Sequence, residues 1–455
     1  MKKALFFWIG LAFASSYAQE HFSGMTTSRR VGITNVGINP SEIVNLNNRF
    51  EIQFISSSFN ISNNIVGFKD ITGDKNIESL VFDGTTPVNL NIDSEIMGPG
   101  FAMRALGWGF AITTKSYLKA DINDFDPQFG KALFNNDINL VTLASLINNE
   151  ANQRISATVW GEIGLSAAKS IINTKSHQLN VGATLKLLFP GTYANFGAGN
   201  FKGTITDTTI NGLSLSELSN ASAYLNLAYS GSLGSNFTNP SDFTKSFFGN
   251  LKGVASDFGF DYQYKGDSNN YKFKIGAAIK NIGSLTFKDE NNSSKYFALD
   301  IHGTDKLNLT QFEEVTSFEE IETIIANSTG TNGKYFTLEE SNKDFVIKLP
   351  TVINAYANIK VFSKFDVSLF MQQKVNDDSG NEQIVSQNSF SITPRLNLGF
   401  FELFAPISKN EISGNSTGIG FRLGGFFLGS NAAITALTAD GKQADFYTGF
   451  RIGFL

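Results

Sequence analysis

One stretch of the chain decides the fold. Residues 255–264 read ASDFGFDYQY, so aromatic residues occupy every second position and polar or small residues fill the positions between them. Because successive side chains of an extended strand point to opposite faces, this stretch has one aromatic face and one polar face. Residues 271–279, YKFKIGAAI, alternate in the same way, and the GDSNN between the two stretches has turn composition. The two stretches therefore predict a β-hairpin with one apolar and one polar face.

The same alternation recurs along most of the chain, at residues 155–166, 179–187, 353–371, 389–398 and 446–454. The predicted strands are about 10 residues long, against a usual 5–6 in globular sheets. Their polar face is rich in Gly, Ser, Thr and charged residues, as in a wet lumen, and their apolar face is rich in aromatic residues, as against lipid. A large secreted β-sandwich or solenoid is the alternative, although no fixed-period repeat supports a solenoid. The pattern favours an all-β fold, a transmembrane outer-membrane β-barrel.

Connections between the predicted strands alternate between tight and long. Tight turns are expected at Gly107-Trp108, Phe362–Lys364, Leu398-Gly399 and Gly424-Gly425, and long connections at roughly 121–152, 190–252 and 284–350. This asymmetry is typical of barrels with short periplasmic turns and long external loops. About 14 antiparallel strands are predicted, an even number that places both ends of the chain on the periplasmic side. They begin near residues 50, 95, 109, 153, 177, 253, 271, 351, 365, 387, 400, 416, 426 and 445. Residues 127–149 and 310–327 have helix-like apolar spacing and are expected to form short loop helices.

The composition excludes several classes of protein. Of the 455 residues, 17% are charged, against roughly 25% in soluble globular chains. The chain has no cysteine, which rules out a disulfide scaffold, a thiolate metal site and a cysteine nucleophile. The net charge of −5 gives no electrostatic basis for binding nucleic acid.

The first residues have the features of a cleaved signal peptide. Lys2 and Lys3 precede the apolar stretch Ala4–Ala14, and Ser16-Tyr17-Ala18 is a small-x-small cleavage site. An uncleaved membrane anchor is the alternative, but the apolar stretch is much shorter than the ~20 residues of a spanning helix. The sequence therefore predicts cleavage after Ala18 and three segments: a signal peptide at 1–18, an N-terminal hatch segment at 19–49 and the barrel at 50–455.

The sequence does not predict an enzyme. Gly414–Gly418, GNSTG, matches the G-x-S-x-G nucleophile pattern, but that motif needs a strand-to-helix turn, and the residues from Ile419 onward alternate as a strand. The three histidines, His21, His177 and His302, have no spacing that assembles a metal site or pairs a base with a serine. We expect no catalytic residues, no cofactor and no metal.

Charged residues on the predicted inner face are the most informative ones. They are Glu51, Arg104, Glu162, Lys186, Asp261, Lys274, Lys360, Asp366, Arg395, Glu402, Arg422 and Arg451. Because both signs are mixed, a lumen filled with ion pairs and water is favoured over a selective polar path. The turn positions predict three cross-strand pairs, namely Lys360 with Asp366, Arg395 with Glu402, and Asp261 with Lys274.

Short motifs resemble known families. Asn39-Pro40-Ser41, just before the first strand, looks like the N-terminal hatch of the long-chain fatty-acid transporter superfamily, whose barrels have fourteen strands. Four further motifs resemble a family of uncharacterised outer-membrane barrels in Bacteroidota: Gly98–Phe101, Trp160–Ser166, Leu349–Thr351 and Thr393–Arg395. The serine replaces the commoner alanine of the hatch motif, so the resemblance implies a barrel in the outer membrane and does not imply transport of fatty acids.

The hatch segment is expected inside or just beneath the barrel, with a disordered periplasmic tail as the alternative. It contains Arg29, Arg30, Asn39 and Pro40, and the arginines are expected to meet lumen carboxylates such as Glu51 or Asp261. Pro40 biases Asn39 toward extended geometry, which suits a chain that leaves a plug to enter the first strand.

Two classes of function remain open. The first is passive transport or diffusion of a small hydrophobic or amphipathic solute, and the second is a non-transporting barrel that scaffolds a cell-envelope or secretion complex. An apolar pocket near the hatch would favour the first, and Phe196, Phe201 and Phe247-Phe248 are candidates either for its lining or for an external contact patch. The expected partners are outer-membrane lipid, the barrel-assembly machinery through the C-terminal strand, and envelope proteins; nucleic acid is not among them.

Overall fold

The computed structural model describes residues 21–454 apart from 23, 27, 29, 31, 74, 135–142, 211–212, 236–247, 267–270, 289–290, 313–314 and 332. The predicted signal peptide and Arg29 therefore lie outside the described residues.

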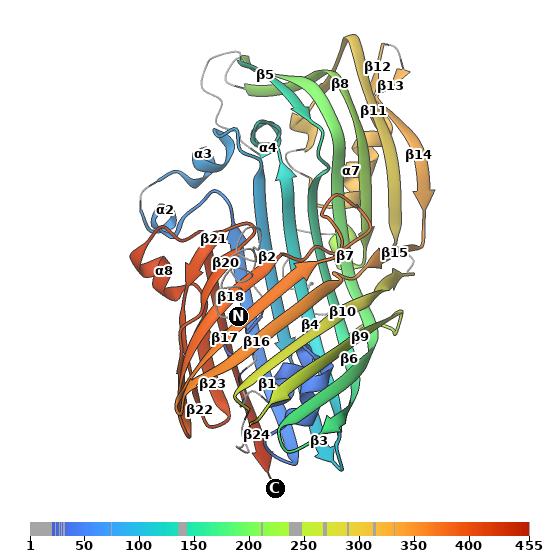
Figure 1. Cartoon of the computed structure of the whole chain (residues 1–455). Helices are drawn as coiled ribbons and strands as arrows, with labels where there is room; N and C mark the ends of the chain where they lie inside the picture. The colour runs from blue at the N-terminus through green and yellow to red at the C-terminus, as the bar shows by residue number, and fades with distance from the viewer. Residues whose placement is uncertain are drawn as a thin grey trace, which may run out of the picture.

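Fourteen antiparallel wall strands close into a ring (Figure 1). In ring order they are β1 (Phe50–Asn63), β2 with β3 (Val88–Met97, Gly100–Ala105), β4 (Trp108–Phe125), β6 (Gln153–Asn173), β7 (His177–Ile210), β9 (Gly253–Tyr264), β10 (Phe273–Phe287), β16 (Val352–Phe362), β17 (Phe365–Lys374), β18 (Ser389–Leu398), β19 with β20 (Phe401–Phe404, Ile407–Asn410), β21 with β22 (Gly414–Thr417, Ile419–Leu423), β23 (Phe426–Ser430) and β24 (Gln443–Phe454). β24 pairs with β1 along its whole length and closes the ring. The predicted outer-membrane barrel of about fourteen strands is confirmed.

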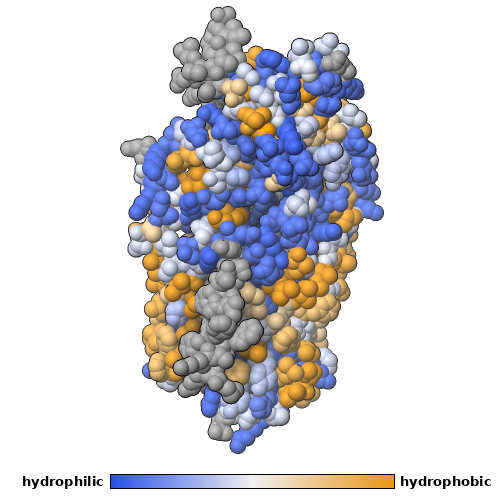
Figure 2. All heavy atoms as spheres, turned by 45° about the horizontal axis from the view of Figure 1, so that its top comes forward, coloured by the Kyte–Doolittle hydropathy of each residue, from blue (hydrophilic) through white to orange (hydrophobic). Residues whose placement is uncertain are grey.

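The outer face of the wall is apolar and the inner face is polar, as the alternation predicts. On the face seen in Figure 2, apolar side chains gather over the lower half of the molecule and hydrophilic ones above them. Exposed side chains on the wall strands include Phe54, Phe101, Phe110, Phe258, Phe260, Ile275, Ile359, Leu403, Phe426, Phe446 and Phe450. At Gln53/Ile55 a β-bulge turns two successive side chains, Phe54 and Ile55, outward. No helix in the described part of the chain is long and apolar enough to cross a membrane.

The two ends of the ring differ. Tight turns and the last strand's end lie at the lower end, and the long connections lie at the upper end (Figure 1). By the rule for such barrels the lower end is periplasmic and the upper end is extracellular.

All three of the long external connections contain strands that the sequence analysis does not expect. The sequence analysis expects β7 to end at Pro190. The strand instead continues to Ile210, because a β-bulge opposite Val159 and Trp160 accommodates the proline. β5 (Leu143–Asn149), β8 (Leu213–Ser230), β11 (Ser293–Asn308) and β14 (Phe336–Asn342) extend the sheet upward from β7. β15 (Phe345–Lys348) pairs with β10, and β12 (Thr329–Gly330) pairs with β13 (Gly333–Lys334).

The helices of the upper end are short. They are α2 (Phe68–Thr72), α3 (Ile77–Phe82), α4 (Pro127–Phe134), α5 (Ser232–Ser235), η4 (Thr310–Phe312), α7 (Phe318–Asn327) and α8 (Ala433–Thr438). The expected helix at 127–149 ends at Phe134, and Leu143–Asn149 is strand β5 instead. The backbone of this segment pairs with β7, which buries Ile147 and leaves Leu146 exposed.

One of the three predicted cross-strand pairs is in register. Lys360 is opposite Asp366, as predicted. Arg395 is opposite Phe404 and not Glu402, and Lys274 is opposite Gln263 and not Asp261. In each of these two hairpins the observed partner lies two residues from the predicted one. A shift of two residues does not change the face on which a side chain lies, so the charges stay on the inner face.

Candidate functional site

The described part of the hatch lies inside the ring, where it appears as dark blue coils in the lower part of Figure 1. It forms two 3-10 helices, η1 (Gly32–Gly37) and η2 (Pro40–Asn45). Asn39 caps η2, because its backbone is extended and its side chain accepts a hydrogen bond of 2.9 Å from the Ser41 N–H. Pro40 occupies the first helical position, where its missing N–H is no loss and its fixed φ suits the helix.

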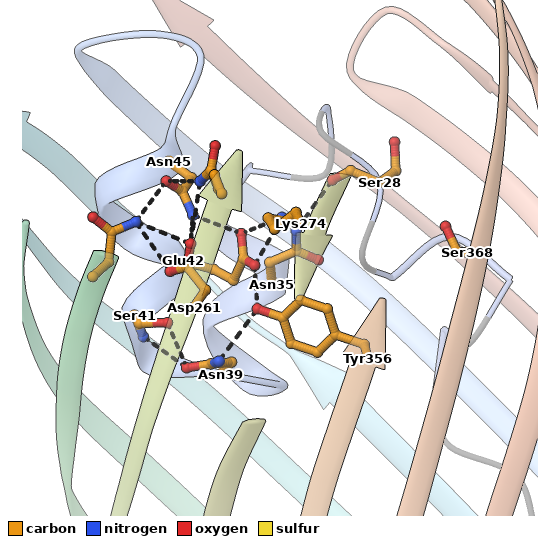
Figure 3. A network of polar contacts seen from close by, with 12 residues as sticks. Ser28, Asn35, Asn39, Ser41, Glu42, Asn45, Asp261, Lys274, Tyr356 and Ser368 are labelled. Carbon is orange, nitrogen blue, oxygen red and sulfur yellow. Dashed lines mark hydrogen bonds and ion pairs between the residues drawn. The ribbon is translucent and has the colours of Figure 1, made fainter. Parts of the chain in front are cut away.

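Asn39 also joins the hatch to the barrel wall (Figure 3). Its side-chain amide donates to the Phe260 carbonyl at 2.8 Å and to the Tyr356 hydroxyl at 3.2 Å. The Tyr356 hydroxyl in turn donates to the Glu42 carboxylate. Asn39, Tyr356 and Glu42 are all buried, so removal of any one of them leaves a buried polar group without its partner.

A buried ion pair completes the contact. Lys274 of β10 lies 2.8 Å from the Glu42 carboxylate, and both side chains are almost fully buried. Asn45 donates to Glu42 at 3.1 Å and to Asp261 at 3.0 Å. Asn180 donates to Asp261 at 3.0 Å. Two buried carboxylates thus share one lysine and several amide donors, which fixes the position of η2 against β7, β9 and β10.

Glycines in the wall leave the room that the hatch occupies. A Cβ atom at Gly182 would lie 2.6 Å from the backbone of Pro40 and Ser41, and one at Gly259 would lie 2.2 Å from the Asn39 side chain. A Cβ atom at Gly109 would lie 2.6 Å from Ile43. These glycines lie on neighbouring wall strands and make the inner surface flat enough for a helix to lie against it.

A second group of charges holds the other side of the hatch. The Glu402 carboxylate accepts a hydrogen bond of 2.9 Å from the Ser28 hydroxyl and lies 3.3 Å from Arg395. Arg395 also donates to the Gly24 carbonyl at 2.8 Å. These contacts tie the start of the hatch to β18 and β19.

Glu51, from the first strand, lies 3.0 Å from Arg451 of the last strand and accepts a hydrogen bond of 2.9 Å from the Ile33 N–H. Among the described residues, Glu51 is thus bonded to Arg451 and the Ile33 N–H, and Asp261 to Asn45 and Asn180, whereas the expectation for Arg29 falls outside the described residues. Arg30 instead lines a cavity of about 770 Å³ at the periplasmic end, together with Arg422 and Arg451.

The remaining predicted lumen charges are spread along the barrel. Glu162 and Asp257 both lie near Lys186, at 3.6 and 2.9 Å. Arg104 is exposed at the periplasmic rim, where it donates to the carbonyls of Asn47 and Asn48. Lys360 and Asp366 are half-buried and line the same periplasmic cavity as Arg30.

A small polar chamber of about 70 Å³ lies beyond the hatch. His21 contacts Asp93 there at 2.9 Å, and Lys115 pairs with Glu95 at 2.8 Å. Lys119 and Lys186 also have carboxylate partners, Asp93 and Asp257, whereas the Asp445 carboxylate accepts hydrogen bonds from Ser430 and the Asn431 N–H, so the chamber is polar and suited to hold water.

The upper end of the lumen is closed by residues 375–388, which we call the mouth loop. Arg154, fully buried on the inner face of β6, donates to the carbonyls of Asp378 and Gln383 at 3.2 and 3.0 Å. The Tyr193 hydroxyl donates to the Asn381 carbonyl at 2.9 Å. Burial raises the pKa of the Asp378 carboxyl, against the opposing effect of Lys374. The lumen is therefore closed at two levels, by the hatch below and by the mouth loop above.

An apolar cavity lies beneath the extended sheet at the extracellular end. It has a volume of about 620 Å³ and is lined by residues of β4, β6, β7, β8, β11, β14, α4, α5, η4 and α7. Its lining is apolar apart from Ser156: Phe125, Phe129, Ile155, Ala157, Ala194, Phe196, Phe201, Leu218, Leu225, Leu233, Leu299, Leu307, Leu309, Phe312, Val315, Phe318, Ile321, Ile325 and Phe336. We call it the pouch. Its volume is within the ~300–1,000 Å³ range of ligand sites.

The pouch contains two of the phenylalanines that the sequence analysis proposes for an apolar pocket, but its position differs from the expected one. Phe196 and Phe201 line it, but it lies at the extracellular end and not near the hatch. Phe248 packs against Phe189 at 5.6 Å outside it, and Phe247 lies outside the described residues. In the described part of the chain, no three His, Asp or Glu side chains are grouped to hold a metal ion.

Comparisons with solved structures return outer-membrane proteins. The toluene transporter TbuX of Ralstonia pickettii is 10% identical, with 97% of this chain and 96% of that chain covered and a TM-score of 0.41. The toluene transporter TodX of Pseudomonas putida is 7% identical, with coverage of 96% and 98% and a TM-score of 0.42. The translocator domain of the autotransporter NalP from Neisseria meningitidis is 6% identical, with coverage of 89% and 88% and a TM-score of 0.27. All three scores are below 0.5, so the fold assignment rests on the closed ring itself.

A sequence comparison gives a firmer relation. The model of a family of unknown function, DUF5723, matches residues 38–431. No curated protein matches the chain.

Proposed function

The chain belongs to the DUF5723 family, whose function is unknown, and we propose from its own geometry that it is a non-enzymatic outer-membrane barrel for passive transport of a small hydrophobic or amphipathic solute. The pouch is the observation that carries this proposal. A cavity of about 620 Å³ with an almost wholly apolar lining favours an apolar ligand, because each buried Å² of apolar ligand surface contributes roughly 25 cal/mol.

The proposal requires the closed lumen to open. The hatch and the mouth loop both fill the described lumen, and each is held by buried hydrogen bonds and ion pairs. Passage through the barrel therefore needs at least the release of these contacts, and the charged chamber between them stays closed to ions at rest.

Uptake of 1-N-phenylnaphthylamine by intact Gram-negative cells tests the proposal, because this apolar dye fluoresces once it has passed an outer membrane that normally excludes it. Expression of the protein should speed the uptake. Phe312→Glu, which places a charge in the pouch, should return the rate to that of cells without the protein. The matched control is Leu437→Glu on α8, which should keep the fast rate. The Leu437 side chain is 80% exposed and does not line the pouch. Equal rates for the two variants would contradict the proposal.

One observation favours the scaffold as a second candidate. Among the described residues β14 pairs with β11 alone, and its residues 337–342 are exposed along the rim of the extended sheet. An exposed edge of this kind is suited to accept a strand from another protein. Chemical cross-linking from a photoreactive residue at Leu338 in intact cells should then yield a discrete envelope partner, and a smear or no product would leave transport as the better candidate.

Export and assembly belong to the same proposal. The signal peptide is cleaved after Ala18, and the barrel-assembly machinery recognises the C-terminal strand, which ends in Phe450–Leu455. N-terminal sequencing of the membrane form should begin at Gln19.

A further inference from the structure

The pouch lies on the lipid side of the barrel wall. In β6 the even-numbered side chains face the lumen, as shown by Arg154 at the mouth loop and by Glu162 beside Lys186. Ile155 and Ala157 have the opposite parity and line the pouch. They pair directly with Phe196 and Ala194 of β7, so the two strands present one apolar face to the pouch. The wall itself separates the pouch from the lumen.

An apolar track on this outer face leads from the lipid-facing band to the pouch. On β7, Leu185 is 48% exposed in the band, and Leu187 above it pairs with the exposed Val254 of β9. Phe189 comes next and packs against Phe248, with ring centroids 5.6 Å apart.

The track ends at the foot of the pouch. Leu233 of α5 lines the pouch and is held in place by the Thr192 hydroxyl, which accepts a hydrogen bond of 3.0 Å from the Leu233 N–H. Val159, on the same outer face of β6, is buried at this level. From Leu185 to Phe196, 11 residue steps that span about 35 Å along the strand, the outer face carries one polar side chain, Thr192, whose hydroxyl is already bonded within the protein to the Ser230 carbonyl and the Leu233 N–H.

We propose that the pouch takes a single alkyl chain of an outer-leaflet lipid, which enters sideways along this track and not from the lumen or the medium. The inference rests on the proposed function, because it names the ligand class and the entry route of the same site. The chemistry favours a chain whose head stays outside: the lining holds no charged side chain, and Ser156, its one polar residue, has lumen-facing parity. The occupant is argued from continuity with the lipid interface, because the track begins among lipid-facing side chains.

Tryptophan quenching tests the route. The chain has three tryptophans, and their replacement by Phe gives a silent background. Phe196→Trp then places one reporter in the pouch, and Tyr193→Trp places a matched reporter three residues away on the inner face of the same strand. In vesicles of phosphatidylcholine with brominated acyl chains, Phe196→Trp should lose most of its fluorescence, and Tyr193→Trp should keep it.

A variant of the track and a second source of chains complete the test. Phe248→Asp should restore most of the fluorescence of Phe196→Trp, whereas Leu437→Asp, also an exposed apolar residue, should not. Quenching of the two reporters to the same extent would overturn the inference, as would quenching that appears only when brominated stearic acid is added from the medium to unbrominated vesicles. In the latter case dye uptake through the pouch would still stand, so failure of the route is distinguishable from failure of the proposed function. Heat-modifiable migration in gels confirms that each variant is folded.

Discussion

At the scale of single residues, the hatch depends on a lysine that belongs to the wall. Lys274 is the cation beside Glu42, and the pair is almost fully buried. Replacement of Lys274 by Met leaves the Glu42 charge unpaired in the interior, which costs about 3–5 kcal/mol for buried pairs. We expect the hatch of Lys274→Met to be released, with faster amide hydrogen exchange at residues 33–45 in detergent micelles. Lys360→Met, at the half-buried periplasmic rim, is the control and should leave the exchange rates unchanged.

Glycine 182 gives a second test of how the hatch is seated. Gly182→Ala brings a Cβ atom within 2.6 Å of the Pro40 and Ser41 backbone, so η2 must move away from β7. Gly199→Ala on the same strand meets its nearest atom at 3.7 Å, an ordinary contact. Limited proteolysis should cut the hatch of the first variant and spare that of the second. Equal resistance would show that η2 does not lie against Gly182.

At the scale of elements, the two faces of each strand should respond differently to charge. Phe260→Lys faces lipid and should cost about 2–4 kcal/mol of folding free energy, measured by urea titration in vesicles. Gln372→Lys faces the polar chamber and should cost much less. By alternation alone, the inward Gly259 and Gly276 would serve as tolerant sites, but the hatch and the Tyr356 ring lie against them, so they are unsuitable controls. Equal penalties at Phe260 and Gln372 would refute the assignment of the two faces.

The C-terminal strand should control assembly. Phe454 pairs with Phe50 across the seam, and their ring centroids lie 5.8 Å apart. Deletion of Phe454 and Leu455 should leave protease-sensitive protein in the periplasm, as judged by fractionation. Normal membrane levels of the truncated chain would show that the last residues are dispensable.

The alternation of side chains is sufficient to predict the wall strands, but not every register or connection. The hairpin at Leu398-Gly399 is shifted because Gly399 adopts a φ of +80° and Leu398 pairs with Phe401, which moves the turn to Gly399-Phe400. β2 begins at Val88 rather than near residue 95; residues 88–93, VNLNID, alternate strictly between apolar and polar, so this earlier start was within reach of the sequence. β11 is missed because its partner β8 is distant in sequence, and pairing between distant strands has no local signal. β8 forms a hairpin with β7, the strand directly before it, so its pairing is local and distance does not explain its omission.

At the scale of the whole molecule, closure at two levels sets the expected conductance. The sequence predicts the hatch, and removal of residues 19–37 alone would then open the lumen. The sequence gives no such signal for the mouth loop. The residues around Arg154, which binds the loop, have the same alternating pattern as those around other inward-facing charged residues. We therefore expect the truncation alone to raise single-channel conductance in planar bilayers only slightly. Truncation combined with replacement of residues 376–386 by a short Gly-Ser turn should raise it much more, and an equal rise in both would mean that the mouth loop is not a barrier.

The contact of Glu51 with Arg451 and the Ile33 N–H joins the first strand, the last strand and the hatch. This meeting point forms only when β24 has paired with β1, so it does not exist until the ring has closed. We therefore expect the N-terminal segment of a partly inserted barrel to be docked incompletely and to stay open to periplasmic proteases. Proteolysis would then distinguish an unfinished barrel from a finished one.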